Sequence, residues 1–254
     1  MDRFSIKGKT ALVTGGSRGI GLMIATGFIE AGAKVYISAR KADVCQVVAA
    51  KLSKIGECVA IPADLSTEAE CIRLAGEITD RENHLDILVN NAGANWGAPL
   101  AEFPDAAWDR VLNLNVKGVF NLTKHLIPML KAGATDDDPS RVINIGSIDG
   151  IQHPALETFS YSASKAAVHH MSAVLAKHLA PEITVNAIAP GPFESQMMAA
   201  TLDAFGDAIA ESAPLKRIGR PSDMAGTAIF LASPAASYIT GVVLPVDGGI
   251  ATTA

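Results

Sequence analysis

The alternation of short apolar runs with longer segments of helical pattern constrains the fold of this chain more than any other feature. Seven such runs occur, at residues 10–14, 34–38, 58–62, 85–90, 141–146, 183–189 and 241–246. Strands separated by helix-length segments imply right-handed βαβ units and a parallel sheet covered on both faces. We therefore predict an α/β fold, a doubly wound three-layer sandwich with seven parallel strands between helices.

Length and composition fit one domain over residues 1–254. A formal net charge of -5 gives no overall attraction to nucleic acid or anionic lipid, so neither is expected as a partner. The three cysteines lack C-x-x-C spacing, the six histidines show no ligand grouping, and no apolar signal segment is present. We expect a cytoplasmic protein without a metal, in which the histidines are structural or surface residues.

A glycine-rich turn, TGGSRGIG, directly follows the first predicted strand and precedes an apolar helical pattern. Gly15, Gly19 and Gly21 permit positive φ and let backbone N–H groups approach a phosphate, while the N-terminus of the helix adds about half a positive charge. The spacing is G-x-x-x-G-x-G rather than G-x-G-x-x-G. Its place between a strand and a helix nevertheless predicts a site for a dinucleotide pyrophosphate.

The end of the second predicted strand, SARK, indicates which dinucleotide binds. An acid at this point would bond the 2′-hydroxyl of NAD, whereas an arginine can hold the 2′-phosphate of NADP. The segment carries Arg40 and no acid, and Arg18 in the glycine turn is a second cation for the same phosphate. Because a guanidinium matches phosphate oxygens with paired hydrogen bonds, we predict NADPH/NADP+ as the cofactor.

The segment FSYSASK places Tyr161 and Lys165 four residues apart, which puts both on one face of a helix. A neighbouring cation lowers the pKa of a phenol. This spacing is weak evidence alone, but it lies downstream of the glycine turn and of a fifth predicted strand that ends near Ser147. The combination predicts a site for proton transfer.

These segments, together with ADL, NNAG, LNV, IGS and PG, occur in the order typical of the short-chain dehydrogenase/reductase family, which the chain resembles over essentially its whole length. The resemblance implies a Rossmann-type fold and a catalytic tetrad of Asn115, Ser147, Tyr161 and Lys165. Tyr161 would donate a proton, Ser147 would hydrogen-bond the substrate carbonyl, and Lys165 would lower the pKa of Tyr161 and hold the nicotinamide ribose. Asn115 would interrupt its helix and hold a relay water.

The resemblance also implies a set of cofactor contacts. They are Gly15, Ser17, Arg18, Gly19, Ile20, Gly21, Arg40, Asp64, Leu65, Asn91, Ala92, Gly93, Tyr161, Lys165, Pro190, Gly191 and Ser195.

Within the family, the segments GGSRGIG, LDILVNNAG and RVINIGS are similar to those of 3-oxoacyl thioester reductases, including the type associated with rhamnolipid synthesis. This implies NADPH-dependent reduction of a 3-oxoacyl thioester to the 3-hydroxyacyl form in fatty acid metabolism. The carrier, acyl carrier protein or coenzyme A, stays open. The spacing of 14 residues from Ser147 to Tyr161 is one longer than in general fatty-acid reductases, and the extra length lies beside the expected pocket.

Residues 192–215 resemble the mobile lid of the family. The substrate contacts that we expect are Trp96, Asp149, His153, Phe193 and Met197. Methionine offers a flexible apolar surface for an acyl chain. Helix packing would explain the apolar lid residues equally well, and plain loop structure would explain His153.

Two other functions stay open: an NADP-dependent dehydrogenase of a polyol, a sugar acid or a cyclic alcohol, and a non-catalytic regulator that binds NADP(H). All four tetrad positions are present, which argues against the regulator. Members of the family associate through helices that correspond here to about residues 105–130 and 159–179. We therefore predict a homotetramer, with a dimer as the alternative.

Overall fold

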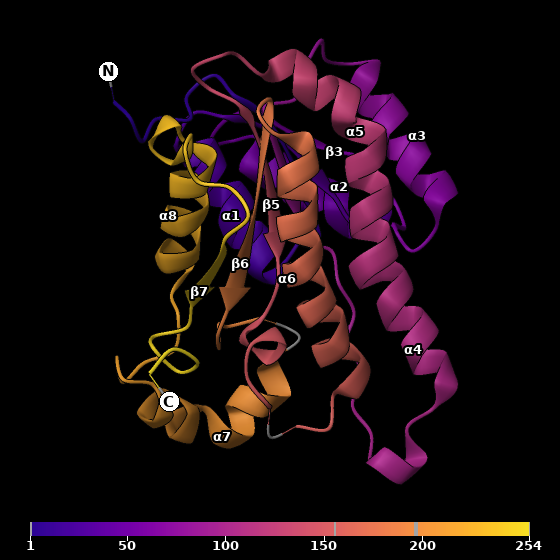
Figure 1. The fold of residues 1–254 in the computed structure, drawn as a ribbon, viewed down its shortest axis with the longest axis vertical. Helices are drawn as coiled ribbons and strands as arrows, with labels where there is room; N and C mark the ends of the chain where they lie inside the picture. The colour runs from indigo at the N-terminus through magenta and orange to yellow at the C-terminus, as the bar shows by residue number, and fades with distance from the viewer. Residues whose placement is uncertain (1, 155, 196–197, 254) are drawn as a thin grey trace.

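The computed structural model describes residues 2–154, 156–195 and 198–253, which form a seven-stranded sheet between two layers of helices (Figure 1). The strands are β1 (Thr10–Thr14), β2 (Lys34–Ser38), β3 (Cys58–Ala60), β4 (Ile87–Asn90), β5 (Ser140–Ile145), β6 (Ile183–Pro190) and β7 (Val243–Val246). Their order is β3-β2-β1-β4-β5-β6-β7, and every pairing is parallel. The predicted Rossmann-type α/β fold is confirmed.

Eight longer helices connect or follow the strands. They are α1 (Gly19–Glu30), α2 (Ala42–Leu52), α3 (Glu68–Thr79), α4 (Asp105–Leu112), α5 (Val119–Gly133), α6 (Phe159–Leu179), α7 (Ala199–Ser212) and α8 (Pro221–Ala232). Four short helical segments complete the described chain: η1 (Leu100–Glu102), the π-helical η2 (Asn113–Gly118), η3 (Ile148–Gly150) and η4 (Pro234–Ala236).

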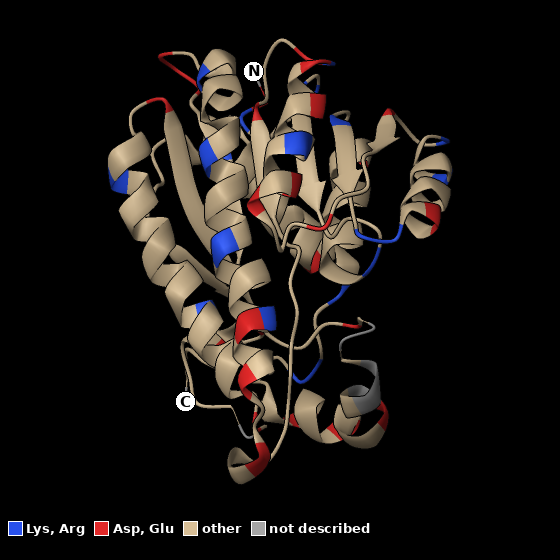
Figure 2. Cartoon of the chain, turned by 90° about the vertical axis from the view of Figure 1, so that its right-hand side faces the viewer, with Lys and Arg blue, Asp and Glu red and all other residues tan. Residues whose placement is uncertain are grey.

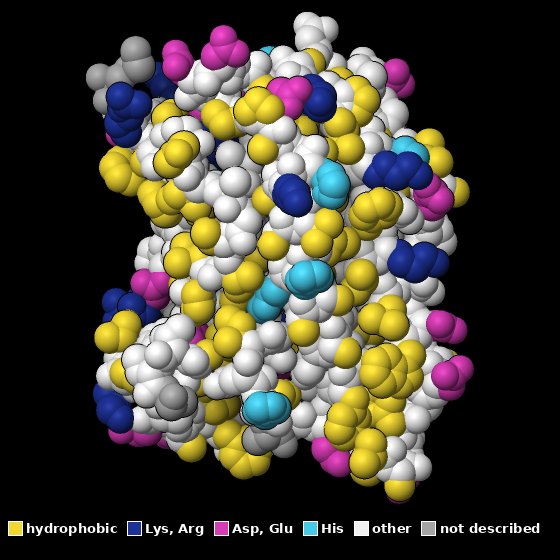
Figure 3. Space-filling model, in the orientation of Figure 1, with side chains coloured by type: hydrophobic (Ala, Val, Ile, Leu, Met, Phe, Trp, Pro, Cys, Tyr) yellow, Lys and Arg dark blue, Asp and Glu magenta, His cyan; other side chains and the backbone are white. Residues whose placement is uncertain are grey.

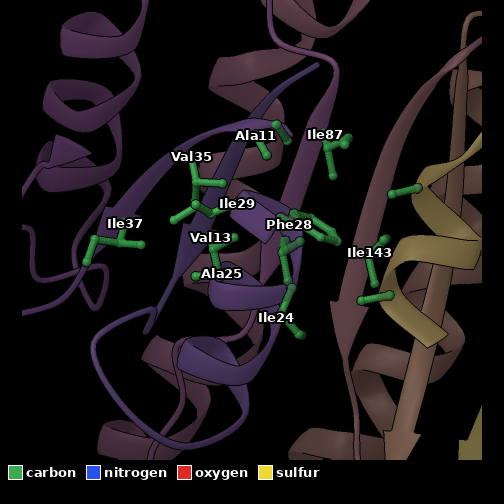
Figure 4. Close-up of a cluster of buried hydrophobic side chains, with 14 of the residues drawn as sticks. Ala11, Val13, Ile24, Ala25, Phe28, Ile29, Val35, Ile37, Ile87 and Ile143 are labelled. Carbon is green, nitrogen blue, oxygen red and sulfur yellow. The ribbon is translucent and has the colours of Figure 1, made fainter. Parts of the chain in front are cut away.

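Two buried apolar clusters, one on each face of the sheet, hold the layers together. Ala11 and Val13 of β1 pack with α1 residues such as Phe28 (Figure 4) and with residues of α2 and α8. Leu12 packs with residues of α3, α5 and α6. Successive side chains of a strand point to opposite faces, so a strand covered on both faces is apolar throughout. This explains why the strands read as continuous apolar runs in the sequence.

The observed strand ends differ from the predicted ones by one or two residues. The first two strands begin and end where predicted, but β4 begins at Ile87 instead of residue 85. Leu85 donates its N–H to the Met129 carbonyl at 3.0 Å, and the Asp86 carboxylate accepts the N–H of Thr10 at 2.7 Å. The two residues before β4 therefore anchor the loop to α5 and to the start of β1.

The strand order reverses between β1 and β4, which lie side by side although two strands separate them in the chain. In open parallel sheets, ligands bind outside the carboxyl ends of the strands at such a reversal. The segments that follow Thr14 and Asn90 therefore lie where a ligand is expected.

Basic residues recur along α4, η2 and α5, at Arg110, Lys117, Lys124 and Lys131. Figure 2 shows Lys and Arg as blue segments spaced along the long helices of this face. Acidic partners neutralise part of this charge, because Lys124 pairs with Glu68 and Lys131 pairs with Glu182, each at 3.0 Å. In the part of the chain that the structure describes, no helix is long and apolar enough to cross a membrane.

Candidate active site

The segments predicted to bind the cofactor all lie at the carboxyl edge of the sheet. The glycine turn follows β1, Arg40 follows β2, Asp64 and Leu65 follow β3, and the NAG segment of residues 91–93 follows β4. Ser147 lies two residues beyond β5, and Pro190, the last residue of β6, precedes Gly191 and Ser195. Parallel strands bring these segments together although the sequence spreads them over 181 residues, from 15 to 195.

The glycine turn needs its glycines because the chain passes very close to the loop after β4. Gly15 has φ +65°, and a Cβ there would lie 2.6 Å from Asn91 Nδ2. A Cβ at Gly21 would collide with the same nitrogen and with the Gly15 carbonyl oxygen. The turn therefore packs closely against the loop after β4 at the N-terminus of α1, with Ser17, Arg18 and Ile20 completing it. This arrangement fits a pyrophosphate.

Ser195, in the segment after β6, lies against Gly19 of the glycine turn. Gly19 has φ +52°, and a Cβ there would lie 3.2 Å from Ser195 Cβ. The Ser195 hydroxyl accepts the N–H of Met198 at 3.3 Å. The segment after β6 therefore reaches back to the first helix, so a nucleotide on the turn would also meet the start of the expected lid.

Thr14 fastens the loop after β4 to the end of β1. Its hydroxyl accepts the N–H groups of Asn91 and Ala92, each at 2.9 Å, and donates to the Val89 carbonyl at 3.2 Å. The Asn91 side chain donates to the Thr14 carbonyl at 2.8 Å. These bonds give the floor of the site a fixed shape at the strand-order reversal.

A cavity of about 250 Å³ lies beside the ends of β2 and β3. Its lining includes Arg40 and Asp64, which the sequence predicted as cofactor contacts. The lining also includes four polar residues that the sequence did not single out: Ser66, Thr67, Arg110 and Asn113. Two guanidinium groups and several hydrogen-bonding side chains suit an adenosine that carries a phosphate. The residues present therefore fit the NADP-type cofactor.

Trp96 lies against one wall of this cavity. The Arg110 guanidinium carbon is 5.5 Å from the centroid of the Trp96 ring, a cation–π contact. Trp96 was predicted to contact substrate. The structure places it on Arg110, which lines the cavity by Arg40, and its contact with substrate stays a prediction.

The Ser147 hydroxyl hydrogen-bonds the Tyr161 phenol and thereby acts to lower the pKa of Tyr161. Ser147 is 8% exposed at the end of β5, and its oxygen also accepts the N–H of Asp149 at 3.1 Å. Tyr161 lies in the first turn of α6, where its backbone carbonyl accepts the Ser164 hydroxyl at 2.7 Å. Two hydroxyls, each able to donate a proton or a hydrogen bond, thus meet at one point.

Lys165 is buried next to this pair. Its Nζ donates to the Ile145 carbonyl at 2.7 Å and lies 5.4 Å from the centroid of the Tyr161 ring. Burial lowers the pKa of Lys165 to about 8, and the nearby Asp149 carboxylate opposes that shift. Burial also raises the pKa of Asp149, against the attraction of Lys165. A small change in local charge can therefore switch the protonation of Lys165 near neutral pH.

The protein without its cofactor does not lower the pKa of Tyr161, and the effect expected of Lys165 stays a prediction for the cofactor-bound enzyme. Burial raises the pKa of Tyr161 to about 12, and the negative charge of Asp149 acts in the same direction. The hydrogen bond with Ser147 opposes this shift but does not overcome it. The phenol is therefore held in its protonated form, the form that a proton donor requires.

Asn115 lies in η2, the π-helical segment that interrupts the helix between α4 and α5. Its side-chain oxygen accepts the Ala94 N–H at 2.8 Å, while its amide nitrogen donates to the Ala94 carbonyl at 3.0 Å and to the Ser164 hydroxyl at 2.9 Å. The side chain thus ties the loop after β4 to α6, next to Lys165. Its part in proton relay stays a proposal.

Three of the four other residues predicted to contact substrate lie in different surroundings. Phe193 is 2% exposed and packs in the apolar cluster that contains α1 and α8, bridged to Gly219. His153 is exposed, and Asp149 is half-buried between Ser147 and Lys165. Met197 lies outside the described residues.

A model of a short-chain dehydrogenase family described as enoyl-(acyl carrier protein) reductase matches residues 15–251. The chain belongs to the short-chain dehydrogenase/reductase family. A curated member, the rhamnolipids biosynthesis 3-oxoacyl-[acyl-carrier-protein] reductase of Pseudomonas aeruginosa, is 50% identical over 250 residues, which cover 97% of both proteins.

Two solved structures of short-chain dehydrogenase/reductases show the same fold with NADP. The Pseudomonas aeruginosa RhlG active-site complex with NADP has a TM-score of 0.96 at 48% identity, over 99% of both chains. A gluconate 5-dehydrogenase from Burkholderia cenocepacia, in complex with NADP and tartrate, has a TM-score of 0.91 at 33% identity, over 100% of this chain and 98% of that one.

Proposed function

We propose that this protein is an NADPH-dependent reductase that converts the carbonyl of a 3-oxoacyl thioester to a secondary alcohol. The observation that carries the proposal is the hydrogen-bonded pair of Ser147 and Tyr161, with Lys165 beside it, at the strand edge that holds the glycine turn. The 50% identity with a 3-oxoacyl-[acyl-carrier-protein] reductase supports the thioester.

The glycine turn would hold the pyrophosphate of NADPH, and Arg40 and Arg110 would hold the adenosine end in the cavity. The first two turns of α6 would present Tyr161 and Lys165 to the nicotinamide end of the cofactor. When bound, NADPH supplies the hydride for the carbonyl carbon.

Tyr161 would act as the general acid, and Ser147 would stabilise the charge that develops on the substrate oxygen. The Asp149 N–H occupies one acceptor site of the Ser147 oxygen, so the Ser147 proton is available to the substrate or to Tyr161. The raised pKa of Tyr161 keeps its proton in place until an alkoxide forms beside it. The protein alone is therefore prepared for the reduction direction.

The direct test is turnover of NADPH by the full chain with acetoacetyl thioesters on coenzyme A and on acyl carrier protein. We expect consumption of NADPH with both, faster with the carrier protein. The variant Tyr161→Phe should lower kcat by about 10²-fold to 10⁴-fold, because it keeps the ring and removes the acid. Wild-type turnover in that variant would overturn the assignment of Tyr161.

The comparisons also define the substrates for control reactions. A 2-enoyl thioester tests the enoyl reductase description of the family model, and gluconate with NADP+ tests the sugar-acid activity named for the Burkholderia enzyme. A 2-enoyl thioester offers no carbonyl to reduce at the reacting carbon, so Ser147 and Tyr161 would have no alkoxide to stabilise. Turnover of either control in place of the 3-oxoacyl thioester would replace the proposed substrate.

We also propose that the enzyme is a homotetramer assembled through α4, α5 and α6. Figure 3 shows hydrophobic side chains gathered over α4, and Trp108, Phe120 and Val174 are 37%, 45% and 43% exposed on these three helices. Burying such side chains between subunits is favourable. A monomeric mass in light scattering would refute the assembly.

All three cysteines are free and buried, which suits a cytoplasmic location.

A further inference from the structure

His169 lies one helical turn after Lys165 on α6 and packs under the turn that carries Ser147. Its side chain is 8% exposed. Nothing in the sequence separates this histidine from the other five, and no role in the mechanism above requires it. Its ring nevertheless packs against the backbone of one short segment, residues 146–150.

The His169 ring contacts both ends of that segment. Nε2 accepts the backbone N–H of Ser147 at 3.4 Å, and the backbone of Gly150 hydrogen-bonds the ring and raises its pKa. A neutral imidazole has one acceptor and one donor nitrogen, so a ring that accepts at Nε2 carries its proton on Nδ1. The ring thus spans η3 from Ser147 to Gly150.

Two glycines make room for the ring. A Cβ at Gly146 would collide with His169 Nε2, and a Cβ at Gly150 would lie 2.8 Å from His169 Cε1. The backbone on either side of η3 is therefore pressed against the imidazole. Replacing the ring would therefore change the backbone conformation of residues 146–150, which positions the Ser147 hydroxyl.

The surroundings keep His169 in the neutral state that this bonding requires. Burial lowers its pKa, and the positive charge of Lys165 lowers it further, while the bond to Gly150 acts in the opposite direction. The charged groups around it are Lys165 on the same helix and Asp149 on η3. Protonation would place a second N–H against the Ser147 N–H and break the bond.

We propose that His169 is a positioning residue that fixes the main chain of residues 147–150 and thereby aims the Ser147 hydroxyl at the substrate oxygen. The inference rests on the proposed carbonyl reduction for its kinetic consequence, but not for its structural one. A misplaced Ser147 would weaken an interaction made mainly in the transition state, so kcat should fall while KM stays nearly constant.

Three variants of the full chain test this role. His169→Phe keeps the ring and removes both hydrogen bonds. His169→Gln restores an acceptor near the position of Nε2. His170→Phe is the matched control, because His170 is the next residue on α6 and is exposed. For each variant we would measure kcat and KM with acetoacetyl-CoA, the Kd of NADPH, the thermal midpoint, and hydrogen exchange of the peptide that contains the Ser147 amide.

We expect His169→Phe to lower kcat about tenfold to a hundredfold, with the Kd of NADPH unchanged, and to speed exchange at Ser147. His169→Gln should recover most of kcat and of the protection, and His170→Phe should match the wild type. Unchanged exchange in His169→Phe, or no recovery in His169→Gln, would overturn the proposal. The proposal would also be overturned if His169→Phe raised the Kd of NADPH by the same factor as it lowered kcat and lowered the thermal midpoint as well. The ring would then stabilise the fold as a whole rather than position Ser147.

The exchange measurement separates this proposal from the proposed function. If the wild type reduced no thioester, the assigned substrate would fail, whereas faster exchange at Ser147 in His169→Phe alone would still support the contact. If the wild type were active and His169→Phe kept both its kcat and its protection, the positioning role would fail and the function would stand.

Discussion

The Nζ atom of Lys165 lies 5.4 Å from the centroid of the Tyr161 ring, and the two groups have pKa values shifted in opposite directions by the same burial. The pKa of Tyr161 rises to about 12 and that of Lys165 falls to about 8. Burial disfavours the charged form of each group, so it favours a neutral phenol and a neutral amine. Lys165 is therefore the group of the pair that titrates nearer to neutral pH.

The first prediction concerns the pH dependence of the two reaction directions. Reduction needs a protonated Tyr161 and benefits from a charged Lys165, so its rate should fall as the pH rises through about 8. Oxidation of the 3-hydroxyacyl product needs a phenolate, so its rate should rise over the same range. Initial rates in both directions across the pH scale would check this. A reduction rate that increases with pH would contradict it.

The second prediction is that Asp149→Asn moves both pH profiles to lower pH. The Asp149 carboxylate raises the pKa of Lys165 and of Tyr161, so its removal lets both groups lose protons more easily. Asn keeps the size of the side chain, and the backbone N–H that Ser147 accepts is unchanged. The measurement is the pH at half-maximal rate in each direction. A shift to higher pH, or no shift, would show that the Asp149 carboxylate does not raise the pKa values of Tyr161 and Lys165.

The third prediction concerns the choice of nucleotide. Arg40→Ala should raise the KM for NADPH by about tenfold to a hundredfold, since one charged hydrogen-bonding group contributes about 1.5–3 kcal/mol. The KM for NADH should change little, because NADH has no 2′-phosphate. Lys54→Ala, which removes an exposed cation from the loop after α2, is the control. Equal losses with both nucleotides would place Arg40 away from the phosphate.

The fourth prediction tests a buried polar chain that links β4 and β5 to α5 and α6 on one face of the sheet. The Asn90 amide donates to Thr123 at 3.0 Å and to the Asn144 side-chain oxygen at 2.9 Å, and the Asn144 amide donates to Ser172 at 2.9 Å. Asn144→Ala would leave buried polar groups short of partners, so the free energy of unfolding should fall by about 1–3 kcal/mol.

Urea unfolding at one fixed protein concentration would measure the effect of Asn144→Ala, because assembly makes apparent stability concentration-dependent. Gln46→Ala removes an exposed amide from α2 and serves as the control. If both variants lost the same free energy of unfolding, the buried polar chain would stabilise the protein no more than an exposed amide does.

The sheet could be predicted well because most strand residues are apolar and most of the strands are buried on both faces. The position of Ser147 and of the glycine turn followed from the same fact, since parallel strands end at one edge. The pKa of Tyr161 could not be predicted, because it depends on how deeply α6 is buried and on where Asp149 lies. A nearby cation in the sequence says nothing of that burial.

Three site residues illustrate the limit of pattern alone. His169 faces η3, and His170 beside it is exposed, yet spacing along a helix does not show which face meets a loop from another strand. Arg110 joins the cavity only because η2 brings α4 beside the end of β3. Phe193 fits a lid or a core equally well by composition, and the structure buries it in the core.

The contact between Trp96 and Arg110 turns one wall of the cavity into an optical reporter. A nucleotide that engages Arg110 would change the polarity around the indole of Trp96, and a reduced nicotinamide absorbs where tryptophan emits. The sequence contains two tryptophans, so Trp108→Phe leaves Trp96 as the sole emitter. Quenching of its fluorescence would then follow cofactor arrival in real time, in the unlabelled protein and before any substrate is known.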